Sequence, residues 1–160
     1  MANATLVEIG QPFVEMAHRI VWCTVATVDA KGRPRSRVLH PIWEFDGEQV
    51  TGWVATGRTP IKEAHIKASP YVSCNYWTQD QDTCMAECAA EWVEDQATKT
   101  AVWDKYINTP PPAGYDPSMI PGWENAESPT FSVLKMTPWR IRVMPGPAMM
   151  TGEGTLLWQA

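Results

Sequence analysis

The stretch from Ile20 to Pro70, IVWCTVATVDAKGRPRSRVLHPIWEFDGEQVTGWVATGRTPIKEAHIKASP, decides the fold. Three runs within it, at 20–28, 34–43 and 49–55, are rich in β-branched and aromatic residues, which favour strands. Turn-forming Asp and Gly residues separate the runs. The stretch therefore predicts three consecutive strands, followed by a helix over 60–68.

The start of that helix has the features of an anion-binding site. Thr59 suits the N-cap and Pro60 the first helical position, whereas Ser69 and the proline after it end the helix. The first N–H groups of a helix lack partners and the helix dipole is positive there, so Arg58 and Lys62 add charge to a site already suited to phosphate. The alternative is an ordinary capped surface helix.

The second strand alternates between two faces. One face carries Arg35, Arg37 and Leu39, and the other carries Ser36, Val38 and His40. Two arginines on one face favour a phosphate contact, although solvated arginines on an edge strand would give the same pattern. His40 is a candidate acid or base, because imidazole titrates near neutrality, or a histidine held by a backbone partner.

The remaining chain supplies further strands and two more helices. Alternation and capping signals predict the following elements: an N-terminal helix within 1–19, strands at 71–77 and 83–93, a helix over 96–107, and a strand over 131–144 bent at Pro138. We expect one domain over 1–160, mainly β with flanking helices, with about six strands in a small barrel.

Two segments fall outside these elements. The proline-rich loop 108–129 carries large apolar residues (Tyr115, Met119, Ile120 and Trp123), so we expect it to shape substrate access. The C-terminal tail 145–160 is apolar at 156–158 and has no evident place in a monomer. Among the nine tryptophans, Trp77 and Trp139 are our candidates for a pocket wall.

These residues resemble a known family, the pyridoxamine 5'-phosphate oxidase-like, FMN-binding split β-barrel proteins, over about 20–93. The resemblance rests on an Arg-x-Val-Leu strand, a second strand that ends in Thr, and a Lys one turn into the following helix. It implies a six-stranded antiparallel split β-barrel. It also implies six cofactor-binding positions: Arg37, Val38, Leu39, Ala55, Thr56 and Lys62. We add Arg35, Arg58 and Thr59 as neighbours of the expected phosphate.

The chain departs from the family pattern at two places. It has Pro60, Ile61 and Lys62 where Ser-Arg-Lys is common, so only Arg58 could replace the missing cation. It has Ile42 where vitamin-oxidising members carry Lys, so pyridoxamine phosphate is not carried over as the substrate.

The resemblance implies a homodimer that binds FMN at the subunit interface and transfers hydride equivalents to or from an unidentified small substrate. Three alternatives stay open. A deazaflavin could replace FMN, with Lys31, Arg33 and Arg35 along its anionic tail. The protein could bind flavin or haem without turnover, or it could be a structural barrel without a cofactor.

Composition limits the other classes of partner. The net charge of −5 and the pI near 5.1 argue against nucleic acid or an anionic membrane. Seven of the 13 Lys and Arg residues lie between positions 31 and 67, which suits a small anionic ligand. The four cysteines have no zinc-site spacing, and we expect reduced core thiols and no metal. No leader or membrane-spanning pattern is evident, so we expect a cytoplasmic protein.

Overall fold

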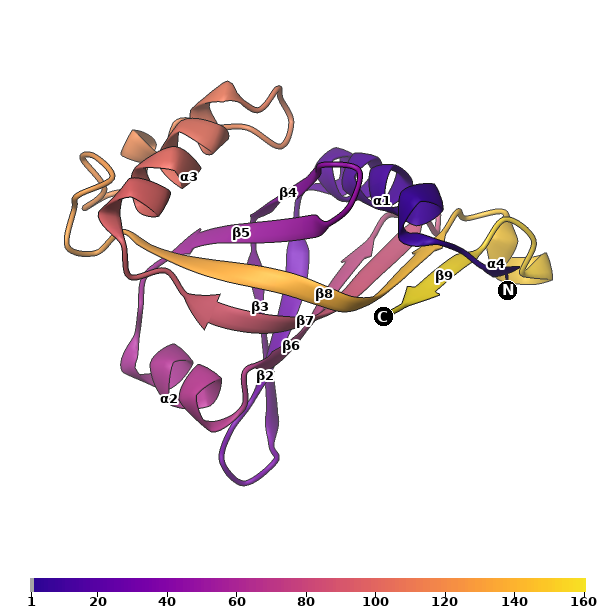
Figure 1. The fold of residues 1–160 in the computed structure, drawn as a ribbon, viewed down its shortest axis with the longest axis horizontal. Helices are drawn as coiled ribbons and strands as arrows, with labels where there is room; N and C mark the ends of the chain where they lie inside the picture. The colour runs from indigo at the N-terminus through magenta and orange to yellow at the C-terminus, as the bar shows by residue number, and fades with distance from the viewer. Residues whose placement is uncertain (1) are drawn as a thin grey trace.

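The computed structural model describes residues 2–160, so Met1 lies outside it. Over these residues, nine strands form one sheet and helices flank it (Figure 1). The strands are β1 (Ala2–Asn3), β2 (Cys23–Val28), β3 (Pro34–Leu39), β4 (Pro41–Phe45), β5 (Val50–Thr56), β6 (Tyr71–Trp77), β7 (Thr83–Trp92), β8 (Ser132–Met144) and β9 (Leu156–Gln159). The helices are α1 (Leu6–Ile20), α2 (Pro60–Ala68), α3 (Gln96–Asn108), the 3-10 turn η1 (Pro117–Met119) and α4 (Ala148–Thr151).

The sheet bends back on itself without closing through hydrogen bonds. Its main path runs β1-β9-β8-β7-β6-β2-β3, and a branch from β8 continues through β5 to β4. The chain itself joins the two ends, because β3 passes into β4 across the single residue His40. The mainly β, antiparallel prediction is confirmed, apart from the short parallel β1–β9 pair. The count of six was wrong, because the second strand divides at His40 and β1 and β9 are added.

Proline explains the division at His40. Leu39 is the last residue of β3 to pair with β2, and Pro41 is the first residue of β4 to pair with β5. Proline has no N–H to donate to a ladder, and it restricts the backbone of the residue before it. The strand therefore changes partner at this residue.

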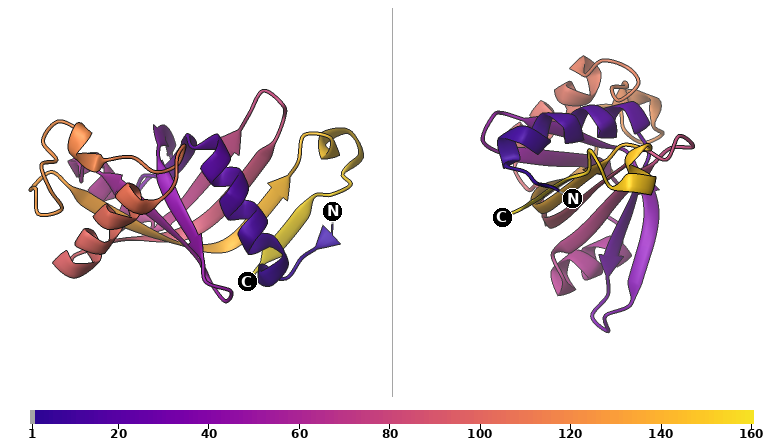
Figure 2. Two further views of the ribbon diagram at one scale, coloured as in Figure 1. Left: turned by 90° about the horizontal axis from the view of Figure 1, so that it is seen from above. Right: turned by 90° about the vertical axis from the view of Figure 1, so that its right-hand side faces the viewer.

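Helix α1 closes one side of the core. A capping box between Thr5 and Glu8 begins it, and it packs against β4 and β8 (Figure 2). Its buried Phe13 meets the indole of Trp43 edge to face at 4.9 Å. The same indole donates to the Tyr76 hydroxyl at 2.7 Å, so the largest buried aromatic group has no unsatisfied polar atom.

Two expected helix caps hold, whereas the expected start of the first strand does not. Helix α2 is capped by Thr59 as predicted, and α3 by Asp95. The first strand begins at Cys23 rather than Ile20, because α1 continues to Ile20. The four cysteines are buried and free, as expected.

The C-terminal tail has a place in the monomer, contrary to our expectation. Strand β9 pairs antiparallel with β8, and Trp158 packs against the main core. The tail therefore gives no argument for a second subunit. Within residues 2–160, no helix has both the length and the hydrophobicity needed to cross a bilayer.

Candidate cofactor site

Arg37, a partly buried residue of β3, forms one end of the candidate phosphate site. Its Nη1 donates to the Thr27 hydroxyl at 3.0 Å, and His65 Nδ1 lies 2.9 Å from the same hydroxyl. The other terminal nitrogen, Nη2, is buried and has no hydrogen-bond partner within the described chain. A buried donor without an acceptor is costly, so this atom marks a place for a bound acceptor.

Lys62 reaches the site from the first turn of α2. The backbone N–H of Lys62 donates to the N-cap hydroxyl of Thr59 at 3.3 Å. The ammonium donates to the Thr56 hydroxyl at 2.6 Å and to the Gly57 carbonyl at 3.0 Å. Because an ammonium has three N–H donors, one of them is left for a ligand.

The site has an excess of positive charge. Neither Arg37 nor Lys62 forms an ion pair with a carboxylate among residues 2–160. Burial, and then the charge of Arg37, lowers the pKa of Lys62, while burial and the nearby Arg35 lower the pKa of Arg37. Two desolvated cations without a counter-ion favour an anion. We call Thr27, Arg37, Thr56 and Lys62 the cation cluster.

Arg58, the third predicted cation, is paired with carboxylates, unlike Arg37 and Lys62. Its guanidinium pairs with Glu94 at 2.7 Å and with Glu63 at 3.1 Å, and it lies 5.2 Å from the centre of the Trp92 ring. The hydrogen bond to Glu94 is the main reason why the pKa of Arg58 is raised. Arg58 is thus already neutralised, and the site has two close cations rather than three.

The other sequence-predicted positions lie on both faces of β3 and at the end of β5. Arg35 is exposed near the N-terminal end of β3, on the same face as Arg37. Val38 is 63% exposed on the opposite face, whereas Leu39 points inward and packs against the core. Ala55 precedes the buried Thr56 and lines a cavity on the far side of β5.

That cavity, of about 590 Å³, lies where β3 passes into β4. Its wall includes the four large apolar residues of the loop (Tyr115, Met119, Ile120 and Trp123), together with Trp22 and His40. His40 Nε2 lies 2.6 Å from the Ala113 carbonyl, and the Tyr106 hydroxyl donates to the His40 carbonyl at 2.7 Å. These bonds attach both the loop and α3 to the joint between the strands. We call residues 109–131 the cap segment.

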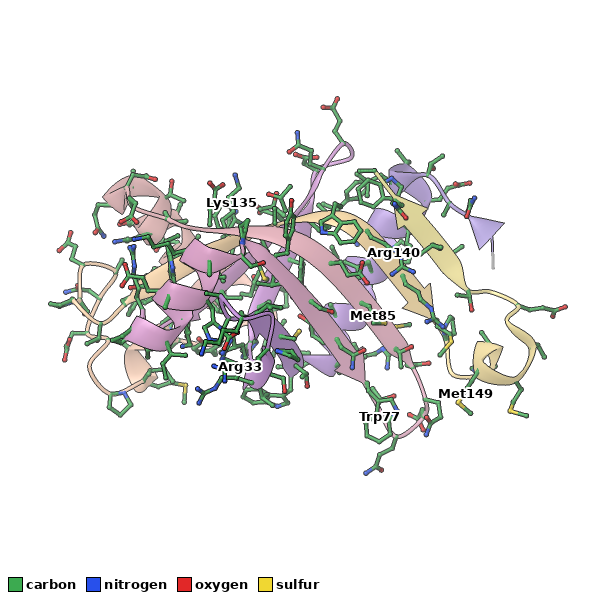
Figure 3. The ribbon with its side chains drawn as sticks, turned by 90° about the horizontal axis from the view of Figure 1, so that it is seen from below. Arg33, Trp77, Met85, Lys135, Arg140 and Met149 are labelled. Atoms are coloured by element: carbon green, nitrogen blue, oxygen red, sulfur yellow. The ribbon has the colours of Figure 1, made fainter. Side chains whose placement is uncertain are left out.

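Two tryptophans predicted for the wall do not line this cavity. Trp77 is half exposed at the end of β6 and projects away from the sheet (Figure 3), and Trp139 lies on the exposed side of β8. Trp22 and Trp123 take that role instead. A strand-end position shows that a ring is near the rim of the sheet, but it does not show which side of the rim it faces.

Sequence reasoning also missed Thr27 and His65. Val25 pairs with Arg37 across the β2–β3 ladder, and Thr27 is two residues further along the same face. A hydroxyl that interrupts a buried apolar face is a signal that could have identified Thr27. His65 lies in α2, and its contact with Thr27 joins residues 38 positions apart, which no local pattern predicts.

The described chain is thus a small, mainly β protein whose sheet folds back on itself, with a candidate anion site between Arg37 of β3 and Lys62 at the start of α2. The family model described as pyridoxamine 5'-phosphate oxidase matches residues 10–144, and the chain belongs to this family. The family resemblance is thereby confirmed. No curated protein sequence matches the chain.

Solved structures share the fold at low sequence identity. A Clostridium acetobutylicum protein related to general stress protein 26 of B. subtilis is 14% identical, with a TM-score of 0.69 over 96% of this chain and 94% of its own. A Nostoc punctiforme pyridoxamine 5'-phosphate oxidase-related, FMN binding protein is 16% identical, with a TM-score of 0.64 over 97% and 90%. General stress protein 26 of Bacillus anthracis is 21% identical, with a TM-score of 0.57 over 82% and 93%.

Proposed function

We propose that the protein is a split β-barrel oxidoreductase that binds FMN through its phosphate at the cation cluster. The observation that carries this proposal is the buried Arg37 Nη2, which has no partner in the described chain and lies beside a second cation without a counter-ion. A flavin phosphate supplies several strong acceptor oxygens and about two negative charges, which match these donors. The family and the FMN-binding Nostoc neighbour support the same cofactor.

The protein's contribution would be to hold and orient the flavin. FMN supplies two-electron redox chemistry when bound, and protein groups position it and adjust its electronics. Arg37, Lys62 and Thr56 would fix the phosphate end. The backbone near Val38 and Ala55 would then lie along the rest of the cofactor, as the family resemblance implies.

We also propose a homodimer with the flavin near the interface. Trp22 and Val38 support it, because these apolar side chains, one just before β2 and the other on the neighbouring β3, are 64% and 63% exposed. Exposed apolar surface of this kind, beside a cofactor site, is typical of an interaction surface.

An absorption spectrum of the purified protein, before and after incubation with FMN, tests the cofactor. We expect the two visible and near-ultraviolet bands of oxidised flavin, and we expect a reduced nicotinamide to bleach them. A protein that neither carries nor takes up FMN would contradict the proposal. A haem band, or the shorter-wavelength band of a deazaflavin, would show that the protein binds that cofactor instead of FMN.

The deazaflavin alternative has one observation in its favour. A cavity of about 380 Å³ lies between the β2–β3 turn and α2, beside His65, and Lys31 and Arg33 are in its wall. However, Arg33 Nε pairs with Asp29 at 2.7 Å, so one of its cations is already neutralised. The shorter FMN needs only the cation cluster, and we therefore favour it.

A further inference from the structure

The cavity beneath the cap segment differs from the cation cluster in charge. In the part of the chain that the structure describes, no Lys, Arg, Asp or Glu lines it. Its two ionisable side chains favour their neutral forms, because burial lowers the pKa of His40 and raises the pKa of Tyr115 to about 12. A charged ligand would be desolvated here without a partner, so the cavity suits a neutral molecule.

Four of the nine residues in the cavity wall carry aromatic rings. The rings of His40 and Tyr115 lie 4.9 Å apart with 38° between their planes, and Trp22 meets His40 at 5.4 Å. The Trp123 indole adds a further ring. Aromatic walls favour flat aromatic ligands through stacked and edge-to-face contacts, and the volume of about 590 Å³ lies within the usual range for small-molecule sites.

His40 brings a ring nitrogen with a defined protonation state to the cavity wall. A carbonyl oxygen can only accept, so the 2.6 Å contact with Ala113 places a proton on Nε2. In the neutral ring Nδ1 is then an acceptor, and no described residue donates to it. A ligand with an N–H or O–H group would complete this hydrogen bond.

We propose that this cavity binds a neutral, planar aromatic molecule that donates one hydrogen bond to His40 Nδ1, and that molecules of this class are the substrates of the flavin. The second half of this inference rests on the proposed function. The geometry supports it, because Ala55 lines the cavity while the adjacent Thr56 belongs to the cation cluster. Ala55 and Thr56 are adjacent at the C-terminal end of β5, so the neutral cavity and the cation cluster meet at this end of the strand.

Three probes of one size test the class of ligand: 2-naphthol, 2-methoxynaphthalene and 2-naphthoate. Calorimetry on the FMN-loaded protein should rank 2-naphthol first. We expect the methoxy compound, which lacks the donor, to bind about 2- to 10-fold more weakly. We expect the carboxylate to bind more weakly by on the order of 10-fold or more. Equal binding of 2-naphthol and 2-naphthoate, or no binding of any probe, would overturn the proposal.

A substitution at an exposed residue of the cavity wall tests whether the probes bind in the cavity or elsewhere on the surface. Met119 is 70% exposed, so Met119→Lys should fold normally and should bind 2-naphthoate on the order of 10-fold more tightly, because it adds a cation to the wall. Met149→Lys is the matched control, since Met149 is exposed in α4, at the opposite end of the molecule from α3 (Figure 1). An equal gain in both variants would show binding elsewhere and would refute the assignment.

A change at His40 tests the polar contact. In His40→Phe the aromatic ring is kept, but both ring nitrogens are lost, and with them the Nδ1 acceptor. The preference for 2-naphthol over the methoxy compound should then disappear, and a preference that persists would exclude Nδ1 as the acceptor.

FMN content, read from flavin absorbance, keeps the two proposals apart. If the protein takes up no FMN but ranks the probes as expected, the proposed function fails and the neutral cavity stands. If 2-naphthol binds the flavin-free protein and is displaced by FMN, the cavity belongs to the cofactor, and the substrate assignment fails.

Discussion

Lys62→Ala removes one cation from the candidate phosphate site and should leave the fold intact. The cap of α2 survives, because the group that donates to Thr59 is the backbone N–H of residue 62. The ion pairs of the described chain do not include Lys62. Removal also relieves the repulsion between Lys62 and Arg37. We therefore expect the variant to unfold at nearly the same temperature as the flavin-free parent.

The loss of FMN affinity follows from the hydrogen bonds of the ammonium. Two of its three N–H groups are used by Thr56 and Gly57, so one is free for the phosphate. A hydrogen bond to a charged group contributes about 1.5–3 kcal/mol. At about 1.4 kcal/mol per decade, the dissociation constant of FMN should rise by roughly 10- to 100-fold.

The assay is a fluorescence titration with FMN and with riboflavin, which lacks the phosphate. Riboflavin should bind the parent and Lys62→Ala about equally, because only the phosphate contact is lost. Lys67→Ala is the matched control, since it removes the same charge from an exposed position of the same helix. It should change FMN affinity by less than about 3-fold, as expected for a screened surface charge. If Lys62→Ala binds FMN as tightly as the parent, or loses riboflavin equally, the start of α2 is not the phosphate site.

Four further outcomes are expected. The pKa of Lys62 lies below the ordinary value of about 10.4, and only the protonated ammonium attracts phosphate. FMN affinity should therefore fall as pH rises through this lowered pKa, whereas riboflavin affinity over the same range should stay level. Arg58→Ala should retain FMN, since its partners are Glu63 and Glu94, and FMN loss on dialysis would contradict this. Tyr76→Phe should cost about 1–3 kcal/mol in urea unfolding, because the buried indole N–H of the core loses its acceptor; an unchanged midpoint would argue against that bond. Light scattering should give twice the 17.9 kDa chain mass for the parent and a monomer for Val38→Asp; a monomeric parent would exclude the proposed dimer.

Local signals predicted the parts of the site that depend on neighbours in sequence. The cap of α2 could be read from Thr59 and Pro60, and strand alternation placed Arg35, Arg37 and Leu39 on one face of the strand. The role of Thr27 depends on the register between β2 and β3, which alternation within one strand does not fix. The ion pairs of Arg58 depend on Glu94, 36 residues away, and no local pattern reports that contact.

The errors also have physical causes. Strand β9 follows a turn rich in glycine and proline, so its pairing with β8 depends on tertiary contact rather than on local propensity. Trp22 reaches the cavity because Val21, with φ of 71°, turns the chain sharply between α1 and β2. Such a conformation is unusual for a β-branched residue, and no sequence pattern announces it.

The cap segment has a consequence for how this protein can be altered. The proposed phosphate ligands all lie between residues 27 and 65, whereas most of the cavity wall comes from residues 109–131, which contribute no strand to the sheet. The cap segment is attached at one end to α3 and at the other to β8, so its exposed side chains can change while the sheet keeps its register. Its Trp123, Ala126 and Phe131 pack in a buried cluster with α3 and would have to be kept. A segment grafted between Asn108 and Ser132 with these three residues retained, and with Ala113 as the acceptor for His40, would redirect ligand choice without rebuilding the cofactor site.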